Sequence, residues 1–520
     1  MSTAISNHFP AFFVSLLLFC VLACNGPDDA QNAPQLKAVQ TATATDTNSV
    51  AGALPFKMEF REMAYNTATQ LPRLQSYAIA VTKNGNWIIS NGRRQGLHTF
   101  KPAPAKNFIP DSSNNFLFLI NPTTGSVGSF DVNQLPPSLS APLKSTNPQF
   151  YYDRATDQLY LMGGYGWKAD KSDMVTFNTL LRYNVSAMEE ALQSNPTPQQ
   201  IASLFEVASD DRYAVTGGIL TKLNNTFYLV FGQNFMGQYR AFGGTDFKQT
   251  YTEEIRAFTL KPNTLQILSY GPIRSSDPDR PFHRRDGNIV EDVDPATGQM
   301  RIASFGGVFL PGVIGAYTYP VFIANAGTPL VVKTANQKFS QYECPVISLY
   351  DSSANSTVYH TFFGGISHHF YHQTDSQSKV YNLVTQEGRN DGFPFVADVS
   401  TFQQSADGTY KEFIHVDPTP NNRLVGSSVV FIPHSSIFSN GYAFPNGVLK
   451  MKNMPKDRPV LVGYVYGGVE AQNPLPLAPN TGTGVSNSVF GVYVTITPTA
   501  AIPADKAHES TKNDANLNRR

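Results

Sequence analysis

The segment Pro148–Gly166, with the sequence PQFYYDRATDQLYLMGGYG, contains the pattern from which we interpret the rest of the chain. Two runs of aromatic and aliphatic residues, at Phe150–Tyr152 and Gln158–Met162, are typical of β-strands. Between them lies Asp153–Asp157, a stretch that contains turn-forming residues. The second run ends in the pair Gly163-Gly164. The segment therefore predicts a β-hairpin that ends at a glycine pair.

The same unit recurs along the body of the chain. Each copy has an apolar strand, a turn rich in Asp, Asn, Thr and Gly, and a second strand that ends in two glycines or a close variant. The glycines have a physical reason, because the backbone turns sharply where sheets converge and a Cβ is unwelcome there. Two copies are degraded and end in Asn91-Gly92 and Phe231-Gly232. These two degraded copies occupy Tyr77–Arg93 and Gly217–Asn234. The other copies occupy Asn288–Val308, Cys344–Ser367 and Val460–Glu470, the last preceded by a strand at Ser427–Pro433.

This pattern resembles kelch repeats, in which an apolar strand ends in Gly-Gly and four-stranded sheets are arranged radially as the blades of a β-propeller. The resemblance covers Phe56–Pro498. The usual kelch period is about 50 residues, so the wider spacing in this chain implies long loops between strands. The aromatic residue that usually follows the glycine pair has only loose counterparts, such as Tyr183 and Phe258. The resemblance bears on the fold and says little about function.

We therefore predict an all-β chain with a kelch-like β-propeller over residues 55–499. Six copies of the unit predict six blades, and a count of seven blades is the alternative. A propeller must close its circle, and Phe56–Arg61 alternates apolar and polar residues, so we expect it to pair beside Val489–Val494 as the outer strand of the last blade. The alternative is a two-domain β-sandwich protein with coincidental glycine pairs. Only one region reads as helical, at Ser186–Leu192 with Pro198–Phe205 following it.

The N-terminal segment predicts export. Ala11–Ala23, AFFVSLLLFCVLA, has the length of a signal peptide and is too short to span a bilayer comfortably, which takes about 20 apolar residues. It leads into Val21-Leu22-Ala23-Cys24, which resembles the bacterial lipobox and implies that a lipid is attached to Cys24. Cys20 fits worse, because the bulky Phe19 precedes it. The residues before the apolar run lack Lys and Arg, which leaves an ordinary secretory peptide or an uncleaved anchor as alternatives.

The residues after Cys24 predict a flexible tether, since they are polar, small and without apolar periodicity. Asp28-Asp29 resembles the acidic export signal of surface lipoproteins in the Bacteroidetes group, and a solvated linker is the alternative reading. The expected location is the bacterial cell envelope, with a lipid anchor in the outer membrane and exposure at the cell surface as one arrangement. We divide the chain into a signal peptide at 1–23, a tether at 24–54, the propeller at 55–499 and a disordered tail at 500–520.

The composition excludes some functions. Lys and Arg together number 39, as do Asp and Glu, so no overall charge draws the chain onto nucleic acid. Aromatic residues make up 12% of the chain and charged residues only 15%, which favours a β-rich fold. The three cysteines are Cys20, Cys24 and Cys344, so the mature body has no intramolecular disulfide framework.

In a propeller, the loops that follow second strands and those that enter first strands project on one face, which we call the loop face. Loops carry function because a rigid scaffold holds them. Arginine forks suit carboxylate, phosphate or sulfate groups, and aromatic faces suit sugar rings, so we predict a glycan, an acidic one in particular, or a protein loop as ligand. The alternative is that these arginines pair with acidic neighbours and serve only structure. The predicted ligand-binding residues are Arg93, Arg94, Trp167, Arg212, His283, Arg284, Arg285, His368 and His369.

Metal-based chemistry has weak support in the sequence. His368–His372 is the densest histidine group, and a metal held there is the alternative to a hydrogen-bonded loop. Galactose oxidase is a kelch-type propeller whose copper is held by two histidines and two tyrosines, one of them crosslinked to a cysteine. The one cysteine of the body, Cys344, lies close to Tyr342 and reads as a buried, inert thiol. We predict no metal and no cofactor.

The leading prediction is a membrane-anchored propeller that binds a ligand through its loop face. Its expected partners are membrane lipid through Cys24 and a glycan or protein ligand, with no nucleic acid. The alternative is an extracellular glycan-acting enzyme or a copper-type oxidase on the same fold. P-loop, G-x-S-x-G and H-E-x-x-H motifs are absent, and no catalytic residue is assigned.

Overall fold

The computed structural model describes residues 54–65, 70–99, 101–240, 246–312, 315–324, 328–353, 355–372, 377–380, 393–415, 417–474 and 482–497. The predicted signal peptide, Cys24 and its lipobox, nearly all of the tether, and the tail at 500–520 lie outside these residues. No helix within the described ranges combines the length and apolarity that crossing a bilayer requires.

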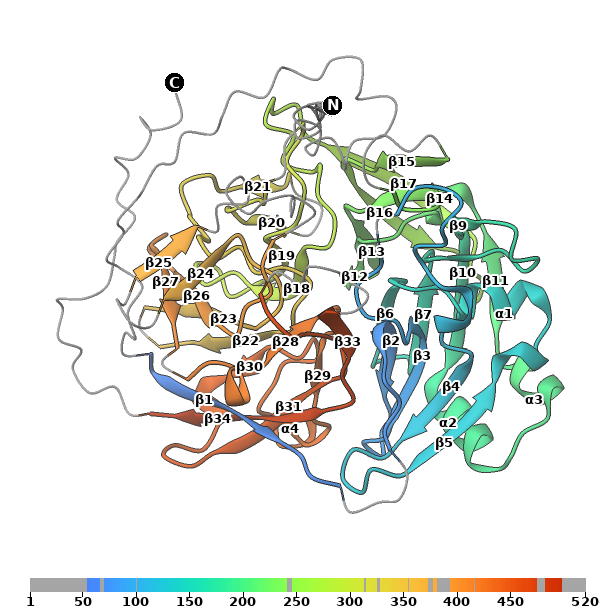
Figure 1. The fold of residues 1–520 in the computed structure, drawn as a ribbon. Coiled ribbons are helices and arrows are strands. Elements are labelled where there is room, and N and C mark those ends of the chain that lie inside the picture. The colour runs from blue at the N-terminus through green and yellow to red at the C-terminus, as the bar shows by residue number, and fades with distance from the viewer. Residues whose placement is uncertain are drawn as a thin grey trace, which may run out of the picture.

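The described residues form an all-β fold, as predicted. Six sheets in this part of the chain share one plan, in which each strand runs antiparallel to its neighbour. In the first five of them the first two strands form a predicted hairpin, whereas in the sixth a longer segment joins these two strands. Figure 1 shows their first strands toward the middle of the view and their last strands at the periphery. The first three sheets are β2 (Gln75–Val81), β3 (Trp87–Arg93), β4 (Phe116–Ile120) and β5 (Val127–Asp131); β6 (Gln149–Asp153), β7 (Gln158–Met162), β10 (Thr179–Asn184) and β11 (Glu206–Ser209); and β12 (Ile219–Leu223), β13 (Thr226–Val230), β16 (Glu254–Leu260) and β17 (Ile267–Arg274).

The remaining three of these sheets repeat the plan with one addition, a short strand that runs parallel to the first strand of the fifth sheet. They are β18 (Asn288–Val293), β19 (Met300–Phe305), β20 (Val321–Ala324) and β21 (Leu330–Val331); β22 (Val346–Asp351), β23 (Thr357–Phe363), β26 (Val399–Ser405) and β27 (Tyr410–Ile414), with β30 (Leu449–Lys450) added on β22; and β29 (Phe431–Pro433), β31 (Val460–Tyr466), β34 (Val489–Ile496) and β1 (Phe56–Glu62).

The sixth sheet joins the two ends of the described chain. β1 pairs antiparallel with β34, from Phe56 opposite Ile496 to Glu62 opposite Phe490. Figure 1 shows the blue β1 lying along the red β34. Phe56 and Met58 are buried in one core cluster with residues of β34, so the pairing also contributes apolar packing. The predicted pairing of Phe56–Arg61 with Val489–Val494 is confirmed.

The glycine pairs adopt a backbone that explains them. Gly163 and Gly164 have φ angles of 64° and 85°, in the left-handed region that favours glycine. A Cβ on Gly163 would lie 2.2 Å from the carbonyl oxygen of Val215, at the start of the next sheet. The degraded copies keep this backbone, since Asn91 has a φ of 61° and Phe231 a φ of 57°. The pair is therefore required by both the turn and the close approach of the next sheet.

Hydrogen bonds at the second glycine connect successive sheets. In five of the six sheets the glycine N–H donates to a carbonyl oxygen near the start of the following sheet. The bond from Gly468 to Leu74 runs from the sixth sheet to the first. The donor–acceptor pairs are Gly92 to Ser145 (2.8 Å), Gly164 to Val215 (2.9 Å), Gly232 to Arg284 (2.9 Å), Gly365 to Val425 (2.9 Å) and Gly468 to Leu74 (2.8 Å).

A second series of hydrogen bonds joins the residues just before or at the start of the first strands. These residues all have positive φ, and we call them the inner turns: Ser76, Asn147, Gly217, Asp286, Glu343 and Ser428. The backbone N–H of one inner turn donates to the carbonyl oxygen of another. These bonds are Ser76 to Ser428 (2.7 Å), Asn147 to Ser76 (3.0 Å), Asp286 to Gly217 (2.7 Å), Glu343 to Asp286 (3.0 Å) and Ser428 to Glu343 (2.7 Å).

The long loops predicted from the spacing contain structure of their own. One further sheet is built from insertions in the second and third sheets, and two smaller ones come from later loops. These strands are β8 (Tyr165–Trp167), β9 (Met174–Thr176), β14 (Gln233–Gly237) and β15 (Phe247–Tyr251); β24 (His369–His372) and β25 (Gln377–Val380); and β28 (Leu424–Ser427), β32 (Val469–Ala471) and β33 (Thr483–Val485).

The predicted helical region is present as α2 (Val185–Gln193) and α3 (Pro198–Ser203). The side chain of Thr197 caps α3 together with Gln200, as a capping box. The expectation that helix is confined to this region is wrong, because α1 (Pro137–Leu143) and α4 (Ser436–Ser439) are also helical. Both are too short for an amphipathic period, and α1 contains a proline near its end, so neither has a clear helical signal in the sequence.

Candidate functional site

Side chains of the inner turns form a polar centre. Asn147 Nδ2 donates to Asp286 Oδ1 at 3.2 Å, and Ser428 Oγ donates to Glu343 Oε2 at 3.0 Å. Burial raises the pKa of both carboxyl groups, and each also affects the other. Two neighbouring carboxyl groups in such a site hold a proton between them rather than ionise independently.

Two of the predicted arginines lie beside this centre. Arg285 Nε is 3.7 Å from Asp286 Oδ2, and its Nη2 donates to the hydroxyl of Tyr239 at 2.7 Å. The Arg285 guanidinium also lies 5.2 Å from the ring centroid of Phe309. Glu343 acts on the other arginine, Arg93, and opposes the lowering of its pKa by burial. The charges of Arg93 and Arg285 therefore converge on one pair of carboxyl groups.

Aromatic rings connect the two arginines. Arg93 lies over the ring of Phe108, with 4.4 Å between the guanidinium carbon and the ring centroid. Phe108 stacks on His98 with centroids 4.6 Å apart, and His98 meets Tyr239 edge to face at 4.7 Å. Burial lowers the pKa of His98 to about 3, and both arginines add to the effect, so this ring is neutral. The row of rings gives apolar faces between two cations.

Arg93 is the unusual member of this group. Its exposed fraction is only 8%, yet its Nε and Nη1 have no hydrogen-bond partner among the described residues. Burial lowers the pKa of Arg93 to about 10, which still leaves it charged at neutral pH. A buried cationic donor without a partner is costly, and buried polar groups in folded proteins are nearly always hydrogen-bonded.

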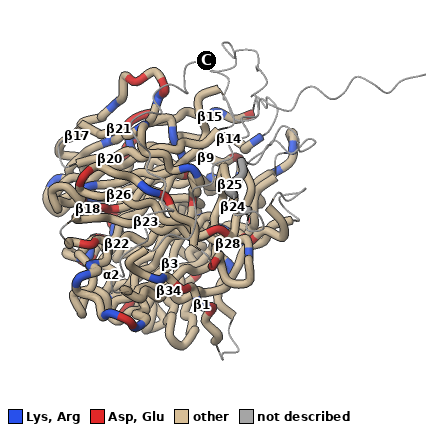
Figure 2. The backbone as a smooth tube through the Cα atoms, turned by 90° about the vertical axis from the view of Figure 1, so that its left-hand side faces the viewer, with Lys and Arg blue, Asp and Glu red and all other residues tan. Residues whose placement is uncertain are grey.

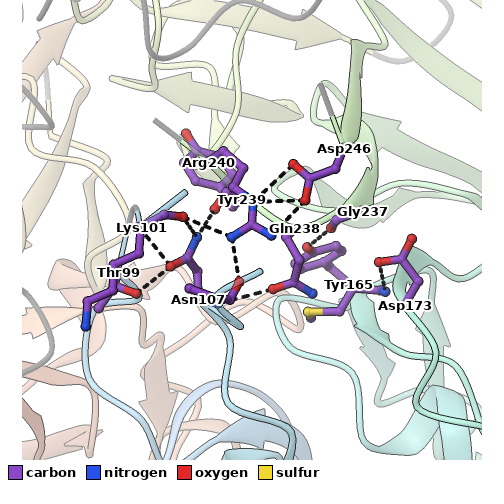
Figure 3. Close-up of polar contacts among 12 residues, drawn as sticks. Thr99, Lys101, Asn107, Tyr165, Asp173, Gly237, Gln238, Tyr239, Arg240 and Asp246 are labelled. Atoms are coloured by element: carbon purple, nitrogen blue, oxygen red, sulfur yellow. Dashed lines mark hydrogen bonds and ion pairs between the residues drawn. The ribbon is translucent and has the colours of Figure 1, made fainter. Parts of the chain in front are cut away.

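A polar network behind Tyr239 holds this arrangement in place (Figure 3). Arg240 Nη2 donates to Asp246 Oδ2 at 2.7 Å, and its Nη1 donates to the carbonyl oxygen of Lys101 at 2.9 Å. Asn107 Nδ2 donates to the carbonyl oxygen of Tyr239 at 2.7 Å. The loop that carries Phe108 is therefore fastened to the segment that carries Tyr239, and the two rings keep their positions relative to Arg93 and Arg285.

Several other predicted residues serve local structure. Arg284 is fully buried, and its guanidinium donates to the carbonyl oxygens of Pro281, Gly306 and Tyr319 at 2.8, 3.0 and 3.1 Å. Arg94 is exposed and donates to the carbonyl oxygen of Asp111 at 2.8 Å. These contacts fit the structural alternative rather than ligand binding, and they use backbone carbonyls in place of the expected carboxylates.

The remaining predicted residues also have separate contacts. Arg212 pairs with Asp210, at 2.5 Å between Nη2 and Oδ2, and His283 Nδ1 lies 2.9 Å from Glu253 Oε1. Lys106 lies 5.1 Å from the ring centroid of Trp167. The rings of His368 and His369 are 5.0 Å apart, and His368 meets Phe393. Of the nine residues, all within the described ranges, the structure gathers Arg93 and Arg285 around the inner turns.

Neither a metal site nor a reactive thiol can be assigned from the geometry. No group of three or more His, Cys, Asp or Glu in the described part of the chain could hold a metal ion, and the side chain of His372 lies outside that part. Cys344 is a buried free thiol whose Sγ lies 3.4 Å from Asn288 Nδ2. Burial raises its pKa to about 12, which makes it a poor nucleophile.

Sequence reasoning missed Phe108, Tyr239 and Glu343, and it missed a cavity of about 670 Å³ between the first strands of the six sheets. The only signal for Glu343 was its place just before a first strand.

In the view of Figure 2, basic and acidic residues are interspersed along the chain, in keeping with the neutral composition. Comparison with known proteins adds no relative, since no family model matches the sequence and no curated protein matches it at a significant level.

Proposed function

We propose that the body of the chain is a six-bladed, kelch-type β-propeller. The support is the four-stranded plan of the six sheets, counted over the described residues, together with the bond from Gly468 to Leu74 and the pairing of β1 with β34. The inner turns add support, because their hydrogen bonds run from one sheet to another around a common centre. A β-sandwich gives no reason for the last hairpin to bond to the first.

We further propose that the mature protein is a lipoprotein of the bacterial cell envelope, attached to the outer membrane through Cys24. The support is the apolar run and the lipobox-like Val21–Cys24 in the sequence, followed by a polar stretch suited to a tether. This location would present the propeller to ligands outside the cytoplasm.

The function that the geometry supports best is the binding of an acidic ligand, such as an acidic glycan, at the centre of the loop face. The single observation that carries it is Arg93, a buried guanidinium whose Nε and Nη1 lack partners among the described residues. Arg285 adds a second cation, and burial raises the pKa of both Asp286 and Glu343, so these two carboxyl groups neutralise the arginines only in part. The rings of Phe108 and Tyr239 lie against the two guanidinium groups and hold them in place.

A glycan array with acidic and neutral glycans tests this function. We expect the chain to select acidic glycans, and Arg285→Gln to weaken that binding at least about tenfold, because a charge-assisted hydrogen bond is lost. Arg94→Gln is the control, since Arg94 is adjacent to Arg93 in the chain but lies at the surface, where it donates to the carbonyl oxygen of Asp111. Equal binding by the wild type and the Arg285 variant, or a preference for neutral glycans, would overturn the proposal. If no glycan on the array binds but an acidic protein loop does, the ligand would be a protein and the proposed site would stand.

A further inference from the structure

The cavity of about 670 Å³ lies between the first strands and is a second place where a ligand can bind. Its size is within the range of small-molecule sites, roughly 300–1,000 Å³. At one end it is lined by inner turns, including Asp286 and Glu343. At the other end it is lined by hairpin turns whose residues, such as Asn224, Asn225 and Pro445, are exposed to solvent. The cavity therefore opens at the face opposite to the loop face.

Arg154 is the notable residue at the open end. Its guanidinium lies between two aromatic rings, with its carbon 5.1 Å from the centroid of Tyr152 and 4.0 Å from that of Phe438. No hydrogen bond or ion pair of this guanidinium is found among the described residues. The neighbouring cation, Lys222, differs because its Nζ is 2.7 Å from Asp153 Oδ2. Arg154 is thus held in place by aromatic faces while its donors stay free to take a ligand.

The acidic side chain of Glu291, which lines the same wall, does not cancel this charge. Glu291 accepts a hydrogen bond of 3.2 Å from Thr221 Oγ1. Burial raises the pKa of Glu291 to about 8, so the group is mainly protonated at neutral pH. With Lys222 and Asp153 paired to each other, the open end of the cavity carries one uncompensated positive charge, that of Arg154.

The rest of the wall is largely apolar. Phe150, Ile219, Val290 and Phe431 are half-buried residues of the first strands or their ends, and they line the cavity. Apolar surface in a cavity favours a ligand body that leaves water. One free guanidinium favours a single negative charge over two, because a second charge would lack a partner in a poorly solvated site.

We propose that this cavity binds an organic carboxylate with an apolar body, with the carboxylate on Arg154 and the body along the strand wall. The cavity reaches Asp286 and Glu343 at its other end, but Arg93 and Arg285 do not line it, so carboxylate binding at Arg154 does not depend on the proposed loop-face site.

Isothermal titration calorimetry with three probes of the same shape tests the proposal on the full-length chain. Phenylbutyrate, phenylbutanol and phenylbutylamine share one apolar body and carry a negative, a zero and a positive charge. We expect phenylbutyrate to bind at least about tenfold more tightly than the other two. Arg154→Gln should remove that preference and leave phenylbutanol binding unchanged. Ile219→Trp should narrow the cavity beside the strand wall and weaken binding of all three.

Two controls separate the site from general effects. Arg274→Gln should leave binding unchanged, since the Arg274 side chain is 72% exposed and pairs with Glu254 on an outer strand. Arg285→Gln should also leave phenylbutyrate binding intact, which distinguishes this cavity from the loop-face site. Arg154→Lys keeps the charge and should retain part of the preference, with circular dichroism melting to verify folding. No binding of phenylbutyrate, equal binding of the three probes, or an unchanged preference in Arg154→Gln would overturn the proposal.

Discussion

The backbone N–H of Gly468 donates a hydrogen bond of 2.8 Å to the carbonyl oxygen of Leu74. Gly468 follows the second strand of the sixth sheet, and Leu74 precedes the first strand of the first sheet. The corresponding bond from Gly164 to Val215 joins sheets that follow each other in the chain. The same contact therefore serves both sequential neighbours and the two ends of the body, which is what a circular arrangement requires.

Substitution of a glycine in a pair should be costly because of the neighbouring sheet as well as the φ angle. Gly163→Ala would place a Cβ 2.2 Å from the Val215 carbonyl oxygen. Gly441→Ala is the matched control, since Gly441 has a φ of 68° but nothing within 4 Å of an added Cβ. We expect a loss in the free energy of unfolding of about 3 kcal/mol for Gly163→Ala and about 1 kcal/mol for the control. Urea denaturation measures both, and equal losses would show that the close contact is unimportant.

Arg284 and Arg94 should differ sharply in their effect on stability. Arg284→Ala leaves buried carbonyl oxygens of Pro281, Gly306 and Tyr319 without their donor and removes a guanidinium that lies 4.2 Å from the Tyr317 ring centroid. We expect it to lower the free energy of unfolding by about 3 kcal/mol, whereas Arg94→Ala should stay within about 0.5 kcal/mol. Thermal melting of the two variants beside the wild type checks this. Similar melting temperatures would refute the structural role of Arg284.

The hairpins were predictable because their signals are local. A strand, a turn and a second strand ending in glycine lie within some twenty residues, and alternation and turn residues mark each part. The pairing of Phe56–Arg61 with β34 was also predictable, although it is distant in sequence, because the predicted propeller needs a closing strand. Helix α1 was not predictable from the sequence, because its seven residues, with a proline near the end, have no periodic pattern.

The site was predictable only in part, because neighbouring residues in one loop have different surroundings. Arg284 and Arg285 are adjacent, yet Arg284 points among backbone carbonyls and Arg285 meets Tyr239 and Asp286. Sequence spacing does not reveal which of the two is buried. Phe108 and Tyr239 come from loops of different sheets, and only the folded chain brings them together around His98.

The stability of the protein should depend on pH through Glu291. Its pKa rises from 4.5 to about 8 on folding, so between these values the folded state binds more protons than the unfolded state. The contribution of this group is therefore fully present below pH 4.5 and is lost as the pH rises through about 8. We expect Glu291→Gln to gain stability relative to the wild type between about pH 5 and about pH 9. Urea denaturation across this range tests it, and a constant difference would contradict the assigned shift.

Attachment to the membrane should depend on Cys24. Cys24→Ser removes the thiol that would carry the lipid, so we expect the chain to move from the membrane to the soluble fraction and to lose labelling by radioactive palmitate. Cys20→Ser is the control and should change neither property. A Cys24 variant that stays in the membrane fraction would show that another part of the chain holds it there.

Both proposed sites lie at the centre of the six sheets described in the structure, so both require that the first and last strands close the fold. Disulfide crosslinking of β1 to β34 tests this closure most directly. Lys57 lies opposite Thr495 and Met58 opposite Val494, and because successive pairs alternate in spacing, K57C/T495C and M58C/V494C cover both geometries. We predict that at least one double variant crosslinks on oxidation, shifts on a non-reducing gel and gains about 4 kcal/mol in the free energy of unfolding, while the single variants do not. Failure of both pairs to crosslink in the folded protein would contradict the account.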